Sequence, residues 1–213
     1  MKQLVFHFDV ISPYAYLAFE RLPQALQGLS YSVVYRPVLF AGLLKHHGQL
    51  VPAEIAGKRD WTYRQVLWLA HSHGIDLRMP AAHPFNPLPL LRLALACADG
   101  GDPNRAVCEA IFRHVWCSGE VATDPQRLQA LVAQLKPVTD VADEGIKQAL
   151  ARNTQQAVER GLFGVPTIEV DGKLFWGLDA LPMLRAWLAA DPWFDTQWDA
   201  AARCAVGAPR VNR

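Results

Sequence analysis

The first of two short segments that could do chemistry is Ser12-Pro13-Tyr14-Ala15. Serine is a preferred N-cap and proline a preferred first helical residue, so this segment predicts the start of a helix. A helix N-terminus favours anions, thiolates included, because its free backbone N–H groups and its dipole act together. The Ser12 hydroxyl could donate to such a thiolate and lower the pKa of the thiol. Capping preferences alone assign Ser12 only the role of a helix cap.

The second segment is Gly164-Val165-Pro166-Thr167, just before a strand-like run. A proline at the entry of a strand is unusual, because it removes one donor from the hydrogen-bond ladder between strands. The segment therefore predicts a special backbone conformation at Pro166.

The elements that position these segments form a β-α-β start and a β-β-α end. A helix is expected from Pro13 toward Gly28, and Asp179 is expected to cap a last helix. The expected strands cover residues 3–11, 31–38, 167–170 and 173–176. The short crossover between the first two strands predicts parallel pairing. Asp171-Gly172 predicts a hairpin between the last two.

Between these ends, from about Phe40 to Gly161, the hydrophobic periodicity is almost entirely helical. Asp102-Pro103 and Asp124-Pro125 predict N-cap and first-turn pairs like Ser12-Pro13. The expected helices include 60–74, 87–98 and 103–116, a helix after 125 and one around 146–157. The expected domains are a discontinuous thioredoxin-like domain of residues 1–39 and 162–190, a helical insertion of residues 40–161, and a C-terminal extension of residues 191–213.

This order of elements predicts an α/β protein with a thioredoxin-like fold and a large all-helical insertion. In that fold the chemistry lies where the first strand meets the first helix, usually in Cys-x-x-Cys. Ser12 and Ala15 take the cysteine positions here. Dithiol–disulfide exchange needs an attacking thiolate and a resolving thiol, so it cannot occur at this place. The thiol of a cosubstrate could take the position instead.

The thioredoxin pattern also gives Pro166 a role. In such folds the proline before the third strand is cis and faces the start of the first helix. A cis-proline leaves the backbone groups of the preceding residue free to pair with an extended peptide ligand, and glutathione is such a ligand. We therefore expect Pro166 to be cis and to lie beside Ser12.

Composition excludes several classes of protein. The chain has 213 residues, of which 51% are hydrophobic and 19% charged, so the bulk of it is not disordered. A net charge of +1 gives no sign of nucleic acid or an anionic membrane as a partner. The apolar run 88–98 is too short to span a bilayer. Because a strand-like run follows Lys2, we expect no secretory leader and a cytoplasmic protein.

The cysteines and histidines carry no further site. Cys97, Cys108, Cys117 and Cys204 form no Cys-x-x-Cys and no metal-ligand spacing, so we expect reduced thiols that pack as small hydrophobes. The pairs His46-His47 and His71-Ser72-His73 lack a third ligand at a helpful spacing, so no metal site is expected.

A family resemblance rests on three longer segments, FHFDVISPYAYLAFERLP, HPFNPLPLLRLALA and GVPTIEVDGKLFWGLDALPML. Together they resemble the 2-hydroxychromene-2-carboxylate isomerases. These enzymes belong to the DsbA-like thioredoxin-fold group and are relatives of kappa-class glutathione transferases. The likeness covers about residues 4–188. Ser-Pro-Tyr and Val-Pro-Thr alone mark only the broader group, whereas the spacing of all three segments makes the match more specific.

The resemblance implies a glutathione site around the first helix. Ser12 would be the catalytic serine that holds the glutathione thiolate, with Pro13 and Tyr14 at the same pocket edge. Val165, held by Pro166, would pair its backbone with the cysteinyl part of glutathione.

The resemblance also implies groups for the two ends of glutathione. Leu178 and Asp179 would take the γ-glutamyl end, with Asp179 accepting from its ammonium group. Lys58 would approach the glycyl carboxylate. The family usually has an asparagine shortly before this lysine, and Gln49 is the amide nearest that position.

On the substrate side, Asn86 falls in the family's Phe-Asn segment, although it could equally cap the following helix. Trp176 lies next to the expected glutathione region in the sequence. The resemblance does not identify the group that binds the substrate carboxylate.

The activity implied is a glutathione-dependent cis–trans isomerisation of a small aromatic carboxylate in naphthalene-type catabolism. A kappa-like transferase that consumes glutathione would use the same site, so the motifs leave this alternative open. A non-catalytic module that holds a peptide at the cis-proline edge is a second alternative. A homodimer is one assembly that the sequence allows.

Overall fold

The computed structural model describes residues 1–99, 101–205 and 207, and the last part of the expected C-terminal extension, residues 206 and 208–213, lies outside them. The described strands are β1 (Lys2–Phe8), β2 (Tyr31–Pro37), β3 (Thr167–Val170) and β4 (Lys173–Trp176). The described α-helices are α1 (Pro13–Ala25), α2 (Phe40–His46), α3 (Ala56–His73), α4 (Leu88–Ala96), α5 (Arg105–Trp116), α6 (Pro125–Leu135), α7 (Glu144–Glu159), α8 (Leu181–Leu188), α9 (Trp193–Thr196) and α10 (Trp198–Ala201). Two short 3₁₀ turns are η1 (Pro52–Glu54) and η2 (Leu178–Ala180).

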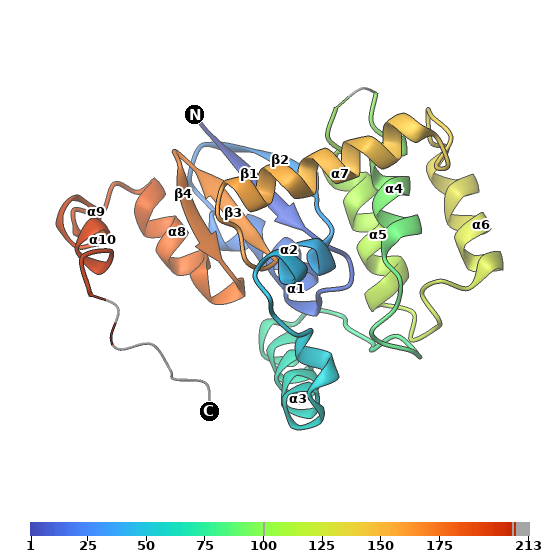
Figure 1. Ribbon diagram of the computed structural model, residues 1–213, viewed down its shortest axis with the longest axis horizontal. Coiled ribbons are helices and arrows are strands. Elements are labelled where there is room, and N and C mark those ends of the chain that lie inside the picture. Colours follow the sequence, from blue (N-terminus) through green and yellow to red (C-terminus); the bar gives the residue numbers. More distant parts are fainter. Residues whose placement is uncertain (100, 206, 208–213) are drawn as a thin grey trace.

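The sheet has the strand order β2-β1-β3-β4 (Figure 1). β1 and β2 are parallel, with Lys2 opposite Tyr31, so the predicted crossover is confirmed. β3 runs antiparallel to both β1 and β4. The β3–β4 turn consists of Asp171 and Gly172, whose φ angles of 50° and 74° are both left-handed, as the Asp-Gly signal predicts.

Helices cover both faces of the sheet. Leu4, Phe6 and Phe8 alternate along β1 and are buried in the larger hydrophobic cluster, which also includes side chains of α1 and α8. A smaller cluster, built around Leu43 and Ala157, lies where α2 and α7 meet. In Figure 1, α7 crosses in front of the sheet.

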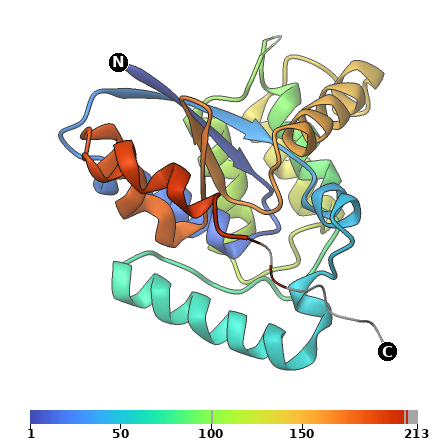
Figure 2. The same ribbon diagram turned by 60° about the vertical axis from the view of Figure 1, so that its left-hand side comes forward.

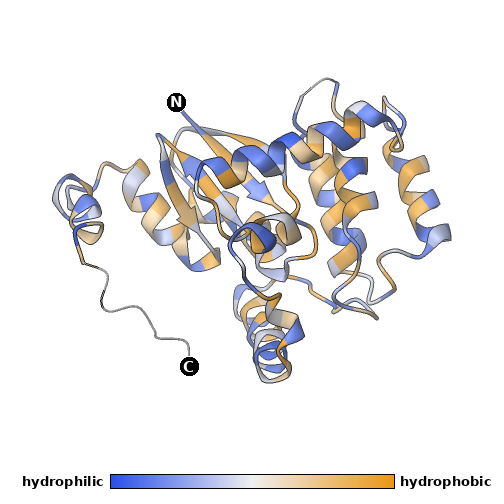
Figure 3. Cartoon of the chain, in the orientation of Figure 1, coloured by the Kyte–Doolittle hydropathy of each residue, from blue (hydrophilic) through white to orange (hydrophobic). Residues whose placement is uncertain are grey.

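The helices between β2 and β3 share the larger cluster with the sheet. Phe19 of α1 lies 5.0 Å from Phe112 of α5 between ring centroids, and the Arg105 guanidinium stacks 4.0 Å over the Phe19 ring. Figure 3 shows hydrophobic residues concentrated on α4 and α5, whereas α7 presents many hydrophilic residues. The helical insertion is thus confirmed, and α4 and α5 pack in the same hydrophobic cluster as the sheet.

Figure 2 shows α3 running along the underside of the molecule, below α1 and the C-terminal helices. At the C-terminal end, Phe194 is buried between Trp187 and Trp198, with ring centroids 5.2 and 5.6 Å away. No helix among the described residues is long and apolar enough to cross a membrane.

Several predicted element boundaries were wrong. α3 begins at Ala56, four residues before its predicted start, and α4 ends at Ala96, two residues before its predicted end. Three other errors have a clear physical cause. β1 ends at Phe8 instead of Ile11, because Ser12 N–H donates to the Asp9 carbonyl and turns the chain. α5 begins at Arg105, and Asn104 caps it in place of Asp102. The Asp102 carboxylate instead accepts from Arg36 of β2 at 2.9 Å, a contact between distant parts of the chain.

The third error concerns Asp179. α8 begins only at Leu181, Ala180 takes the N-cap position, and no side-chain hydrogen bond caps the helix. Gly177 has a φ of 95° and leads into the turn η2, so Asp179 lies inside that turn, before the helix.

Candidate active site

Ser12 lies at the junction of β1 and α1 as predicted. It has an extended backbone (φ −88°, ψ 116°), and its Oγ accepts from Ala15 N–H at 3.3 Å, so it is the N-cap of α1. The same oxygen donates to the Val165 carbonyl at 3.2 Å. The bond to Val165 joins the two segments that the sequence singled out, 153 residues apart.

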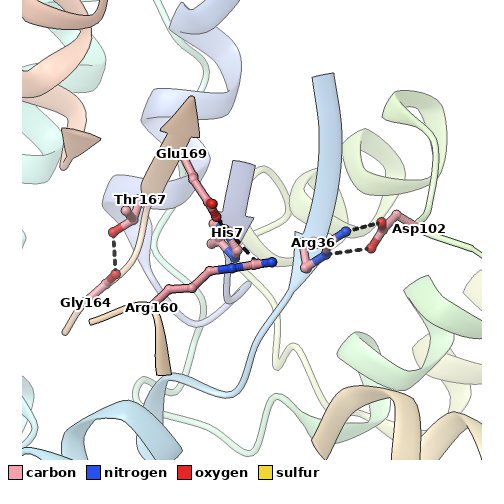
Figure 4. Close-up of polar contacts among 7 residues, drawn as sticks. All are labelled: His7, Arg36, Asp102, Arg160, Gly164, Thr167 and Glu169. Carbon is pink, nitrogen blue, oxygen red and sulfur yellow. Dashed lines mark hydrogen bonds and ion pairs between the residues drawn. The ribbon is translucent and has the colours of Figure 1, made fainter. Parts of the chain in front are cut away.

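The loop before β3 has the expected form. The Val165–Pro166 peptide bond is cis, and Pro166 lies beside the N-terminus of α1, so both parts of that prediction are confirmed. Thr167 Oγ1 donates to the Gly164 carbonyl at 2.7 Å (Figure 4), and Gly177 N–H donates to the Pro166 carbonyl at 2.9 Å. These bonds fix the loop that faces Ser12.

A polar cluster stands beside this loop, on the face of the sheet opposite the larger hydrophobic cluster. His7 Nε2 of β1 lies 3.1 Å from Glu169 Oε2 of β3, and Arg160 approaches the same carboxylate at 3.5 Å (Figure 4). Burial lowers the pKa of His7, and the Glu169 hydrogen bond offsets only part of that effect. A neutral His7 that donates to Glu169 therefore ties β1 to β3 next to the site.

Two adjoining cavities open at the junction. The first, here the serine cavity, has a volume of about 810 Å³ and is lined by Ser12 and Lys58, among others. The second, here the aspartate cavity, has a volume of about 700 Å³ and is lined by Pro166 and Asp179, among others. They share the lining residues Tyr14, Gln65, Val165 and Trp176.

The boundary between the cavities is well defined. The Tyr14 hydroxyl of α1 donates to Gln65 Oε1 of α3 at 2.7 Å. On the other side, the Trp176 ring packs on Phe163, with 4.9 Å between centroids, and lies directly over Gly164. A Cβ at Gly164 would come 2.6 Å from Trp176 Nε1, so glycine is required for this close approach.

Nearly all of the predicted site residues line these cavities. The serine cavity contains Ser12, Pro13, Gln49 and Lys58, the aspartate cavity contains Pro166, Leu178 and Asp179, and both contain Tyr14, Val165 and Trp176. Asn86 is not among the lining residues. Its Oδ1 accepts from the N–H of Leu88, the first residue of α4, at 3.1 Å. Pro87 takes the N-cap position, so Asn86 supports the start of α4 from one residue before the cap, close to the other role that the sequence allowed.

Asp9 is a site-supporting residue that sequence analysis did not single out. Its side chain is completely buried, and its two oxygens accept from Ile11 N–H at 3.1 Å and Phe40 N–H at 2.9 Å. Burial raises the pKa of Asp9 to about 7, although both N–H donors oppose the rise. Asp9 thereby joins the loop that carries Ser12 to the start of α2.

The pKa shifts of Asp9 and His7 should have opposite effects on how the free energy of unfolding changes with pH. Between about pH 4 and 7 the folded state holds a proton on Asp9 that the unfolded state has lost, so this group lowers the free energy of unfolding as pH rises. His7 is protonated more readily when unfolded, so it raises that free energy over part of the same range. Asp9→Asn should leave only the rising contribution.

We therefore expect the free energy of unfolding of Asp9→Asn, relative to wild type, to increase from pH 4.5 to pH 7. Urea unfolding at several pH values measures it. A constant difference between the two proteins would show that Asp9 is already ionised in the folded state at pH 4.5.

Sequence analysis also missed many lining residues of the serine cavity, among them Arg59, Tyr63 and His83. Arg59 and Tyr63 belong to α3, and His83 to the following loop. His83 Nε2 lies 2.8 Å from the Ile11 carbonyl oxygen, and Trp116 Nε1 donates to the Val10 carbonyl at 2.9 Å, so both contacts brace the loop before Ser12. The His83–Pro84 bond is cis. In the sequence this loop was marked by the family segment HPFNPLPLLRLALA, which begins at His83, but nothing there singled out the histidine as a site residue.

The thiols lie away from the Ser12 junction. Cys108 is fully buried, and burial keeps the pKa of its thiol well above the usual range. The four cysteines are free, and none of them lines either cavity. Among the described residues, no three His, Cys, Asp or Glu side chains come together as metal ligands.

A variant with all four cysteines replaced by alanine or serine should therefore keep its turnover per folded molecule. Its free energy of unfolding should fall, because Cys108 fills the core. Activity with saturating glutathione, corrected for the folded fraction, measures this. Loss of activity in the folded variant would mean that a protein thiol takes part in the chemistry.

Comparison with known proteins agrees with this geometry. The model of the DSBA-like thioredoxin domain family matches residues 3–189. The chain belongs to this family. Its fold is accordingly the DsbA-like thioredoxin fold that the sequence predicts.

Individual similar proteins show which members of this family the chain resembles. A 2-hydroxychromene-2-carboxylate isomerase of Sphingobium xenophagum is 26% identical over 194 residues, which cover 88% of this chain and 98% of that protein. The glutathione S-transferase kappa 2 of Caenorhabditis elegans is 27% identical over 210 residues, covering 88% and 92%. The solved structure of a 2-hydroxychromene-2-carboxylate isomerase has a TM-score of 0.78 at 22% identity, covering 95% of this chain and all of the other. The resemblance stated from the sequence is therefore confirmed.

Proposed function

We propose that this protein is a glutathione-dependent isomerase that interconverts 2-hydroxychromene-2-carboxylate and trans-o-hydroxybenzylidenepyruvate in the breakdown of aromatic compounds. The observation that carries the proposal is the Ser12 hydroxyl, which caps α1 and contacts the Val165 carbonyl where a redox protein of this fold would have cysteine. The relatives named as isomerases support the reaction class, and those named as kappa glutathione transferases support the cofactor.

The donor set of the two cavities fits glutathione. Among the described residues, Val165 N–H has no hydrogen-bond partner, so it can pair with the backbone of an extended peptide. Lys58 in the serine cavity offers a cation for one end of the peptide. Asp179 in the aspartate cavity offers an acceptor for an ammonium group at the other end.

The protein residues would prepare the reaction in three ways. Ser12 and the N-terminus of α1 would favour the charged form of a sulfur at this position. Glutathione, when bound, would supply a thiolate for reversible addition to the conjugated double bond, which is the chemistry that permits rotation about that bond. Arg59 lines the same cavity as Lys58 and is the group that we assign to the substrate carboxylate. Trp61 and Phe40 would form walls for the aromatic ring.

The test follows the absorbance of 2-hydroxychromene-2-carboxylate with the purified protein, with and without glutathione. We expect conversion to the trans enone only when glutathione is present, with no net loss of glutathione. Conversion without glutathione would overturn the proposed cofactor. Stoichiometric loss of glutathione would instead indicate a kappa-like transferase, which the relatives of that name also support.

A further inference from the structure

The serine cavity contains a tyrosine–histidine pair, Tyr63 and His83, with short contacts. The Tyr63 hydroxyl oxygen lies 2.7 Å from His83 Nδ1 and 3.1 Å from the His83 carbonyl oxygen. The second ring nitrogen, Nε2, lies 2.8 Å from the carbonyl oxygen of Ile11. Both side chains are half-buried and both line the cavity together with Ser12.

The network fixes where the protons are. A carbonyl oxygen only accepts, so His83 Nε2 carries a hydrogen and donates it to Ile11. In a neutral imidazole the other nitrogen is then an acceptor. The single Tyr63 hydroxyl hydrogen can reach Nδ1 or the His83 carbonyl, and Nδ1 is the nearer acceptor. Burial lowers the pKa of His83, although the bond to Ile11 opposes this, so the neutral form is favoured at neutral pH. His83 can therefore receive a proton from Tyr63.

The pair also lies in the cavity that contains Ser12. His83 contacts the carbonyl of Ile11, the residue that precedes the N-cap Ser12. Burial raises the pKa of Tyr63 and thus keeps its hydroxyl protonated. The charged groups that act on Tyr63 are Arg59 and Asp60, its neighbours on α3, and they oppose each other.

We propose that Tyr63 and His83 form a proton relay that opens the ring of the hemiketal substrate before isomerisation. This inference rests on the function proposed above, in which the substrate enters as a closed chromene ring. Such a ring must open to expose the conjugated double bond. Opening moves one proton from the hemiketal hydroxyl to the phenolic oxygen, which is a task for a group that can both accept and return a proton.

The relay balances every proton and electron pair. The hemiketal O–H proton passes to the Tyr63 oxygen while the Tyr63 proton passes to His83 Nδ1. The electron pair of the O–H bond forms the ketone, and the pair of the ring C–O bond leaves on the phenolic oxygen. His83 then returns its proton through Tyr63 to that oxygen. Both residues end as they began, and no other reactant is consumed.

The test compares two substrates in the full chain with saturating glutathione. One is the hemiketal 2-hydroxychromene-2-carboxylate. The other is cis-benzylidenepyruvate, which lacks the ortho hydroxyl and cannot close to a ring. General acid–base catalysis typically contributes about 10²- to 10⁴-fold, so Tyr63→Phe should lower turnover of the hemiketal about 100-fold. Turnover of the ring-free enone should be unchanged.

His83→Gln is the second variant, because glutamine can still donate an N–H to Ile11 but has no basic nitrogen. It should show the same selective loss. Tyr31→Phe is the matched control, because Tyr31 begins β2 at the edge of the sheet away from Ser12, and both substrates should react normally.

Other results would contradict either the relay or the proposed function. An equal loss on both substrates, or no loss on either, in folded Tyr63→Phe and His83→Gln would overturn the relay. A wild-type protein that isomerises neither substrate would instead overturn the proposed function.

Discussion

Ser12→Ala is expected to lower turnover at pH 7 about 10- to 100-fold with glutathione saturating, while the affinity for glutathione changes much less. A hydrogen bond to a charged group contributes roughly 1.5–3 kcal/mol, so its loss should raise the pKa of the bound thiol by about one to two units. The thiolate fraction at neutral pH would fall accordingly. Binding would persist because Lys58, Asp179 and the Val165 N–H are retained, although the Val165 carbonyl loses its Ser12 donor.

The pH–rate profile separates this cause from a general loss of structure. The deficit of Ser12→Ala should shrink as pH rises toward the new thiol pKa, and thiolate absorbance of bound glutathione should shift with it. Ser30→Ala changes an exposed serine before β2 and is the matched control, with no expected effect.

Loss of the N-cap adds a separate effect on stability. Replacing an N-cap serine with alanine costs about 1 kcal/mol of stability, so turnover must be expressed per folded molecule. Near-normal turnover with an unchanged pH profile would reduce Ser12 to a helix cap. That result would also favour a non-catalytic module that holds a peptide at the cis-proline edge.

The parts of the fold that sequence predicted are those fixed by local chemistry. Ser12-Pro13 and Asp124-Pro125 both start helices, since each side chain accepts from N–H groups of the first turn. Asp102-Pro103 has the same local signal but does not start a helix, because Arg36 of β2 binds the Asp102 carboxylate. A capping preference of about 1 kcal/mol is small enough for one such long-range contact to override.

The candidate site likewise has a part that the sequence predicts and a part that it does not. The proximity of Ser12 and Val165 could be predicted because the thioredoxin order of elements places their two segments side by side. The contact between Tyr63 and His83 could not be predicted, because it depends on how the loop between α3 and α4 folds back to Ile11. No periodicity encodes that path. Asp9 escaped notice for a similar reason, since its second partner, Phe40, begins a different element.

Gly177→Ala should weaken glutathione binding by displacing Asp179. A Cβ at Gly177 would come 2.5 Å from Asp179 Oδ1, and the φ of 95° strains any other residue. If Asp179 accepts from the ligand ammonium, losing that contact should cost about 1.4 kcal/mol, a tenfold rise in Kd. Asp179→Asn should weaken binding to a similar extent, and the double variant should bind no worse than either single one.

Gly172→Ala separates the clash from backbone strain. Gly172 also has a left-handed φ, 74°, but a Cβ there meets no atom within 4 Å. Both alanine variants should lose stability, whereas only Gly177→Ala should lose affinity in calorimetric titrations with glutathione. Equal losses of affinity would trace the effect to strain in the β3–β4 hairpin. Unchanged affinity in both, and in Asp179→Asn, would remove Asp179 from the ammonium site.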